Sequence, residues 1–147
     1  MKLLYYVLPL IAGIAMSVQS GINSQLRVSI QHPVMASMIS FLVGTMALGI
    51  VLLFSKDPLP AFSAYGAVEL YKFSGGILGA FIVFVALVSV SKIGASNMFV
   101  LIITGQLITA VFMDHFGLLG LSVKAITLQK SIGILLLILG AYLVNRK

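Results

Sequence analysis

The sequence predicts an all-α, polytopic integral membrane protein with five transmembrane helices. Of its 147 residues, 61% are hydrophobic and 8% are charged, and the mean hydropathy is +1.19. In ordinary soluble domains about a quarter of the residues are charged. Five apolar stretches are each long enough to cross a bilayer core of about 30 Å, which takes about 20 helical residues. No polar stretch approaches the ~50 residues of a soluble domain, so residues 1–147 are expected to form a single transmembrane domain.

The composition also limits the chemistry. There is no Cys, and the two His and three acidic residues show no ligand spacing, so we expect no metal site and no cofactor. The net charge of +6 comes from Lys and Arg residues that stand singly or in pairs between apolar stretches. This distribution is typical of membrane anchors and topology determinants, and it does not indicate nucleic-acid binding.

The first predicted helix covers residues 3–26, with Pro9 tolerated in its first turns. Its start is similar to a signal peptide, but the apolar run is too long for that, so a retained helix is expected. Gln19 and Asn23 stand four residues apart and therefore share one helix face. Their amides would hydrogen-bond a polar solute or its ammonium group. The alternative is hydrogen bonding between helices, which is worth ~0.6–2 kcal/mol.

The second predicted helix covers residues 33–54 and begins at Pro33, a residue favoured at the first helical position. Ala36, Ser40 and Gly44 repeat every four residues, and such a stripe of small side chains allows another helix to approach closely.

A polar connection over residues 55–71 follows, with a short interfacial helix expected within 61–70. The third predicted helix covers residues 72–91. It opens with a GxxxG pattern, Gly75 to Gly79, which also favours close helix packing.

The fourth predicted helix, residues 94–116, is the most polar of the five. A polar group in hydrocarbon without a partner costs several kcal/mol, so this helix is expected to face protein or a water-filled path. Asn97 and Gln106 lie within it and are candidate solute-binding residues.

Asp114 is the only carboxylate within a predicted spanning helix, which makes it a candidate coupling or gating residue. Its position near the helix end equally fits a local hydrogen bond, or an ion pair with Lys124 or Lys130. His115 could titrate near neutral pH, but adjacent residues on a helix do not face each other.

The fifth predicted helix, residues 130–145, is almost entirely Ile and Leu apart from Gly133 and Gly140. These two glycines lie seven residues apart on nearly the same face. We expect that face to dock against another helix, for example one from a partner chain.

With five crossings the termini lie on opposite sides of the membrane. If the N-terminus is cytoplasmic, that side holds five positive charges and the other side four. The five are Lys2, Lys56, Lys72, Lys124 and Lys130, and the four are Arg27, Lys92, Arg146 and Lys147. A difference of one charge barely biases insertion. Either a single weakly encoded orientation or insertion both ways is consistent with it, and the second would allow an antiparallel pair with inverted-repeat symmetry.

Several sequence runs carry a resemblance to a known family. They are GQL at 105–107 followed by DHFG at 114–117, QSGIN at 19–23, GGILGA at 75–80, and GILL at 133–136 with Gly140. With these runs the chain resembles, over essentially its whole length, the YdcZ-type proteins, which are half-size, five-helix members of the drug/metabolite transporter superfamily. One departure is the aromatic residue before the Gly-Gly pair, often Trp in such sequences and here Tyr71 or Phe73.

The resemblance implies a multi-pass protein of the bacterial inner membrane that exports a small molecule. It also implies half of a ten-helix bundle, because full-length members contain two five-helix halves in opposite orientations. The last helix is distantly similar to that of the small multidrug resistance proteins. Those proteins carry a Glu in the first helix, whereas this first helix has no acidic residue, which argues against proton-coupled export of lipophilic cations.

The leading hypothesis is therefore a small secondary transporter that works by alternating access, as a homodimer or as a heterodimer with a paralogous half. Its solute would contact Gln19, Asn23, Asn97 and Gln106, with Asp114 in coupling or gating. The alternative is a non-transporting accessory subunit of a larger membrane complex. An enzyme is a distant third, because no nucleophile–base pair, metal cluster or phosphate loop is visible.

Overall fold

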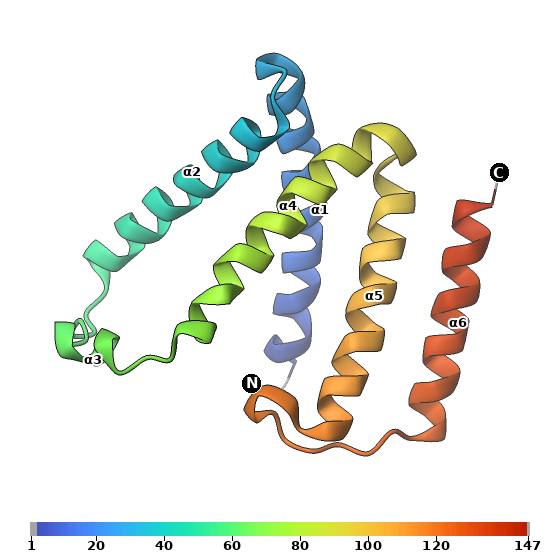
Figure 1. The fold of residues 1–147 in the computed structure, drawn as a ribbon. Helices are drawn as coiled ribbons and strands as arrows, with labels where there is room; N and C mark the ends of the chain where they lie inside the picture. Colours follow the sequence, from blue (N-terminus) through green and yellow to red (C-terminus); the bar gives the residue numbers. More distant parts are fainter. Residues whose placement is uncertain (1–2, 147) are drawn as a thin grey trace. The chain divides into compact units, whose positions relative to one another are not determined.

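The computed structural model describes residues 3–146 as helices joined by connections (Figure 1). Among these residues, five helical segments are long and apolar enough to cross a membrane. They are α1 (Leu4–Ile30), α2 (Pro33–Phe54), α4 (Ser74–Ile93) with the preceding 3-10 turn η1 (Leu70–Phe73), α5 (Ala95–Phe116) and α6 (Leu128–Asn145). The predicted all-α membrane fold with five spanning helices is confirmed.

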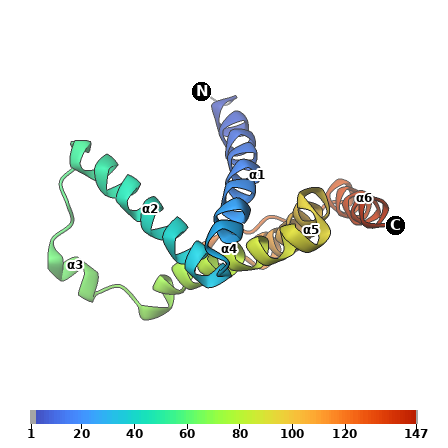
Figure 2. The ribbon, with the colours of Figure 1, turned by 90° about the horizontal axis from the view of Figure 1, so that it is seen from above.

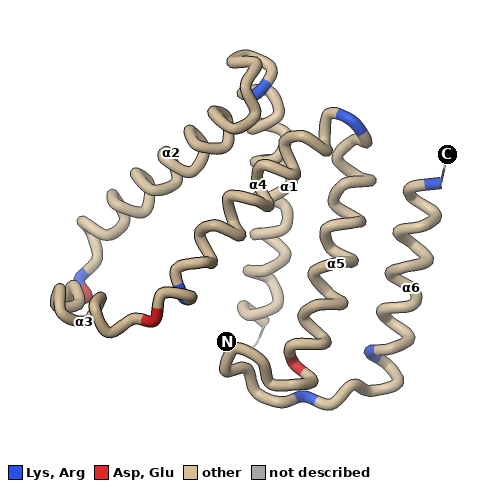
Figure 3. Tube along the Cα trace, in the orientation of Figure 1, with Lys and Arg blue, Asp and Glu red and all other residues tan. Residues whose placement is uncertain are grey.

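By its internal contacts the chain divides into two units, Met1–Lys92 and Ile93–Lys147. We describe each unit by itself. Charged residues lie at helix ends and in connections in both units, as Figure 3 shows, so the centres of the spanning helices carry no charge. Lys2 and Lys147, two of the charges that bear on the orientation, lie outside the described residues.

In the first unit, α1 and α2 form a hairpin whose turn is specified by three consecutive residues. Gln31 ends α1 in the left-handed conformation, with φ 53°. His32 then caps α2, because its Nδ1 accepts a hydrogen bond of 3.2 Å from the Met35 N–H. Pro33 follows at the first helical position, where its missing N–H costs nothing. From this turn the two helices diverge, as Figures 1 and 2 show together.

The small-residue faces of the first unit are packed only in part. Ala36 is fully buried near the α1–α2 turn, and a Cβ on Gly79 would lie 3.5 Å from the Phe41 ring. Around Gly44 and Gly75, in contrast, there is nothing within 4 Å of where a Cβ would stand. The GxxxG pattern of α4 therefore provides room for one aromatic ring in this unit and does not mark a close backbone crossing.

The connection between α2 and α4 contains the short helix α3 (Phe62–Gly66) and η1. A helix was expected within 61–70, and α3 lies there. Its aromatic residues Phe62 and Tyr65 stack with their ring centroids 6.0 Å apart. Glu69 and Lys72 form a surface ion pair of 3.6 Å.

In the second unit, α5 and α6 lie side by side as an antiparallel pair (Figures 1 and 2). Gly94 precedes α5 with φ 81°, and Gly117 ends it with φ 61°. The connection that follows contains the 3-10 turn η2 (Leu118–Gly120) and folds back on the helix end, because the Lys124 N–H donates a 2.8 Å hydrogen bond to the Asp114 carbonyl. Thr127 then caps α6, its Oγ1 accepting from the Lys130 N–H at 3.3 Å.

Candidate functional site

One face of α1 is polar and buried. Ser20 and Asn23 are each 7% exposed, and Arg27, one helical turn further on, is half-buried. At 3.6 residues per turn these three positions lie within about 60° of one another around the helix. We call Ser20, Asn23 and Arg27 the α1 polar face. Gln19 borders it and is exposed.

The hydroxyl of Ser20 has no hydrogen-bond partner among the described residues, although its oxygen is buried. Several other hydroxyls of this unit donate to a carbonyl of their own helix. Ser17 donates to the Gly13 carbonyl at 3.2 Å, Ser37 to Pro33 at 3.1 Å and Thr45 to Phe41 at 2.9 Å. This local bond is the usual solution for a hydroxyl in a membrane helix. Ser20 therefore differs from these three residues, because its buried hydroxyl has no partner.

Asn23 is as buried as Ser20, at 7% exposed, although its amide atoms are not among the fully buried polar atoms that lack a partner. An amide side chain can donate two hydrogen bonds and accept two. No hydrogen bond joins the Asn23 amide to another residue between 3 and 92. An unpaired polar group in an apolar environment costs free energy, so Ser20 and Asn23 together form a place where a polar solute would be stabilised.

Arg27 connects α1 to α4. Its Nη1 donates to the Ser91 Oγ at 2.5 Å and to the Leu87 carbonyl at 3.4 Å. Leu87 is 1% exposed and is one of the two largest fully buried side chains of the chain. Arg27 and Ser91 both lie near the C-terminal ends of their helices, so α1 and α4 run in the same direction at this contact. The guanidinium thus lies at the end of the α1 polar face, beside α4.

A small pocket of ≈ 220 Å³ lies next to this face. It is lined by residues of α1, α2 and α4, including Gln19, Ser40, Gly44, Thr45 and Val83. Gln19 is the one predicted site residue that lines it. Gly44 contributes no side chain, so the backbone of α2 is open to the pocket at this point.

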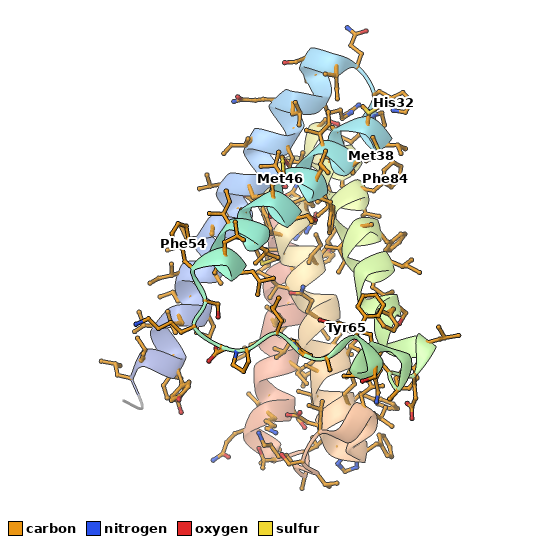
Figure 4. The ribbon with its side chains drawn as sticks, turned by 90° about the vertical axis from the view of Figure 1, so that its left-hand side faces the viewer. His32, Met38, Met46, Phe54, Tyr65 and Phe84 are labelled. Atoms are coloured by element: carbon orange, nitrogen blue, oxygen red, sulfur yellow. The ribbon has the colours of Figure 1, made fainter. Side chains whose placement is uncertain are left out.

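A second, larger space lies between α2 and α4. This groove of ≈ 630 Å³ is almost entirely apolar. Met38 from α2 and Phe84 from α4, both labelled in Figure 4, stand on its two walls, together with Phe41 and Phe81. Such a groove accommodates acyl chains or apolar side chains and offers no polar recognition.

The remaining predicted site residues belong to α5, in the second unit. Asn97 is half-buried and Gln106 is exposed. They stand nine residues apart, so they point to opposite sides of the helix. Thr104 is satisfied within its own helix by the Val100 carbonyl at 2.7 Å. A solute beside one side of α5 would therefore reach either Asn97 or Gln106, but not both.

Asp114 is half-buried in the last turn of α5. In the part of the chain that the structure describes, its carboxylate forms no ion pair with Lys124 or Lys130. The bond that does join Asp114 to Lys124 runs between backbone atoms. The neighbouring His115 has a buried Nδ1 without a partner, and its ring meets the Phe116 ring edge-on at 4.8 Å. Within residues 3–146, no three His, Asp or Glu side chains come together as a metal site would need.

Three residues of the site region, Ser20, Arg27 and His32, are absent from the sequence-based site predictions. Arg27 was considered only as a charge that bears on the orientation, although its spacing of four from Asn23 places both on one helix face. His32 had no structural role assigned. The signal for its capping role is its position directly before Pro33, at the start of an apolar stretch.

Five helices that are long and apolar enough to cross a membrane define a class, that of multi-pass membrane proteins. The family described as "Putative inner membrane exporter, YdcZ" matches residues 4–143, and the chain belongs to this family. The chain is also 26% identical over 136 residues to "Inner membrane protein YdcZ" of Escherichia coli (strain K12), covering 92% of this chain and 91% of that relative. No solved structure matches the chain. The protein is therefore a multi-pass membrane transporter of the bacterial inner membrane.

Proposed function

We propose that this protein exports a small polar molecule by alternating access, and that it acts as a carrier and not as an enzyme. The observation that carries the proposal is the α1 polar face. Ser20 and Asn23 are buried, and the Ser20 hydroxyl has no hydrogen-bond partner among the described residues. A protein that needed only helix packing would lose nothing by having apolar residues there, because an unpaired hydroxyl costs about 1–3 kcal/mol. A solute that supplies the missing hydrogen bonds explains why polar residues stand at these positions.

The solute would contact Gln19 and Asn23 on α1, and Asn97 or Gln106 on α5. Gln19 lines the pocket beside the α1 polar face, which supports its assignment. Asp114 would serve in coupling or gating, since it is the only carboxylate in a spanning helix and it has no ion-pair partner among the described lysines.

Two five-helix chains would build the transport pathway. They would form a homodimer, for which an antiparallel arrangement is one form, or a heterodimer with a paralogous half. Only four apolar side chains are buried among the described residues: Ala36, Leu87, Met98 and Ala141. Each unit leaves most of its apolar surface open, and the glycine face of α6 has no neighbour within its own unit. The near-balance of positive charge between the two membrane sides supports the antiparallel form.

Transport can be tested although the solute is unidentified. Vesicles containing the purified protein are loaded with a small-molecule extract of the host cells, and the loss of each compound is followed by mass spectrometry. We expect at least one compound to leave these vesicles faster than it leaves protein-free vesicles. When Asn23→Ala and Gln106→Ala are combined, its export rate should fall about tenfold or more, which corresponds to the loss of at least ~1.4 kcal/mol of solute binding.

Ser37→Ala is the matched control, because Ser37 is as buried as Asn23 but its hydroxyl is satisfied within α2. Its rate should match the wild type. An unchanged rate in the double variant would show that the site residues are wrongly assigned. If no compound left faster than from empty vesicles, the accessory-subunit hypothesis would replace the transporter.

A further inference from the structure

We propose that the Arg27 end of the α1 polar face binds an anionic oxygen group, a carboxylate or a phosphate, so that the solute of this transporter is a small anion. The class of solute rests on the proposed function, whereas the binding of an anion at Arg27 does not. The inference combines the charge of the first unit, the free hydrogen-bond donors of Arg27 and the position of the polar face along α1.

The spanning helices of the first unit carry positive charge without any negative charge. Arg27 and Lys92 are the charged residues of α1, α2 and α4, which contain no Asp or Glu, and the turn η1 adds Lys72, which pairs with Glu69. The two cations lie at the same end of the unit, since Arg27 bonds to Ser91, the neighbour of Lys92. A carboxylate at this end of the unit would be attracted by both charges, whereas a cation would be repelled.

In the predicted five-crossing topology, Asp114 does not neutralise the Arg27 of its own copy. In a chain with five crossings, α1 and α4 end on one side of the membrane, and α5 ends on the other. Asp114 lies in the last turn of α5, so the two residues belong to opposite membrane faces. The other two acidic residues, Asp57 and Glu69, lie in the connection between α2 and α4, and Glu69 already pairs with Lys72.

Arg27 keeps donors available after it has bonded to α4. A guanidinium carries five N–H donors in a planar fork that matches a carboxylate or phosphate in a bidentate arrangement. Both hydrogen bonds of Arg27 in this unit use Nη1, to Ser91 and to Leu87. The donors of Nε and Nη2 remain for a ligand, and Ser91 fixes the position of the guanidinium so that little rotamer entropy is lost on binding.

The order of residues along α1 suits a solute with an anionic end and an uncharged polar end. At 1.5 Å per residue, Arg27 lies about 15 Å from the middle of α1, near the edge of the hydrocarbon. Asn23 lies about 9 Å and Ser20 about 5 Å from the middle on the same face. The charged group would stay at the membrane edge with Arg27, and the polar remainder would bond to Asn23 and Ser20 deeper in the bundle.

The test uses the reaction of arginine with phenylglyoxal, because the chain contains only two arginines, Arg27 and the exposed Arg146. The full-length protein is placed in phosphatidylcholine nanodiscs, and the modification rate of each arginine is measured by mass spectrometry at constant ionic strength. The probes are acetate, benzoate, succinate, citrate and inorganic phosphate, each carboxylate paired where possible with its uncharged amide. Arg146 is the internal control for any direct effect of a probe on the reagent.

We expect at least one anion to slow the modification of Arg27 about tenfold at ten times its dissociation constant, as simple occupancy requires, with Arg146 unchanged. The matching amide should have no effect. Ser91→Ala removes one of the two hydrogen bonds from Arg27 to α4 and leaves the charge, so it should keep the protection. If Arg27 served only to hold the helices together, no anion would protect it in either protein, and that result would overturn the proposal.

A lipid headgroup could supply the same chemistry as a free solute. Replacing phosphatidylcholine with phosphatidylglycerol, without any added probe, distinguishes the two sources. Protection by phosphatidylglycerol alone would assign the anion site to lipid and overturn the solute class. Protection by a soluble anion in phosphatidylcholine supports it, even if the vesicle experiment finds no export, because binding at Arg27 and transport are measured independently.

Discussion

Replacing Ser20 with Ala should stabilise this protein while impairing its transport. Ser20 and Ser37 are a matched pair, since each is 7% exposed and each lies in a spanning helix of the first unit. They differ in one respect. The Ser37 hydroxyl donates to the Pro33 carbonyl at 3.1 Å, and the Ser20 hydroxyl has no partner.

The magnitude follows from this difference. Removing a buried hydroxyl that makes no hydrogen bond recovers its desolvation cost, about 1 kcal/mol or more. Removing one that makes a hydrogen bond in a membrane helix loses about 0.5 kcal/mol. The gain in helix propensity from Ser to Ala is the same in both variants and cancels when they are compared. We therefore expect Ser20→Ala to be more stable than Ser37→Ala by about 1.5 kcal/mol, and more stable than the wild type.

The assay is reversible unfolding in mixed detergent micelles. Because the chain has no Cys, two introduced cysteines can carry a pair of dyes whose energy transfer reports the separation of α1 and α2. Equal destabilisation by Ser20→Ala and Ser37→Ala would refute the reasoning, since the Ser20 hydroxyl would then have a structural partner in the folded assembly. A stabilised Ser20→Ala variant that exported at the wild-type rate would show that no solute uses this hydroxyl.

Three further outcomes are expected. Gly117→Ala should destabilise the protein by about 2–3 kcal/mol, because the φ of Gly117 is 61° and the new Cβ would lie 2.8 Å from a Val123 methyl group. Gly120→Ala should cost only about 1 kcal/mol, because Gly120 has a φ of 80° but open space around it. The melting temperatures of the two variants test this difference. His32→Ala should cost about 1 kcal/mol through loss of the α2 cap, and His32→Asn should restore most of it, as measured by the same unfolding assay. Paired reporters at the C-terminus, one active only in the cytoplasm and one only outside it, should both give signal if copies insert both ways; signal from one alone would exclude the antiparallel homodimer.

The fold could be predicted because apolar length and strong local signals determine most helix ends. Pro33 marks the start of α2, and glycines with positive φ flank α5, so these ends agree with the sequence. The differences have local causes. The first helix ends at Ile30 instead of residue 26, because no Gly or Pro stops it and Gln31 adopts the left-handed conformation. The third begins as a regular α-helix at Ser74 instead of residue 72, since residues 70–73 form a 3-10 turn.

The candidate site could be predicted only in part, because a spacing rule places residues on a face without showing what that face meets. Gln19 and Asn23 share a face, as the spacing of four indicates, but their surroundings differ: one lines a pocket and the other is buried. Arg27 extends the same face. Its contact with α4 depends on residues more than sixty positions away in the chain, and no local pattern reports that contact.

Whether a polar residue in a membrane helix serves packing or a solute depends on whether its own helix already satisfies it. In the first unit Ser17, Ser37 and Thr45 are satisfied by carbonyls of the preceding turn, so they have little left to offer a ligand. Ser20 and Asn23 are not satisfied in this way, although by residue type alone they look the same.

The same criterion applied to α5 removes Thr104 and leaves Asn97 and Gln106, which lie on opposite sides of the helix. A solute that contacts Asn23 can therefore meet only one of these two amides from a given copy of α5. Single alanine variants of Asn97 and Gln106 should then differ sharply in their effect on transport, and the residue with the larger effect identifies the side of α5 that lines the pathway.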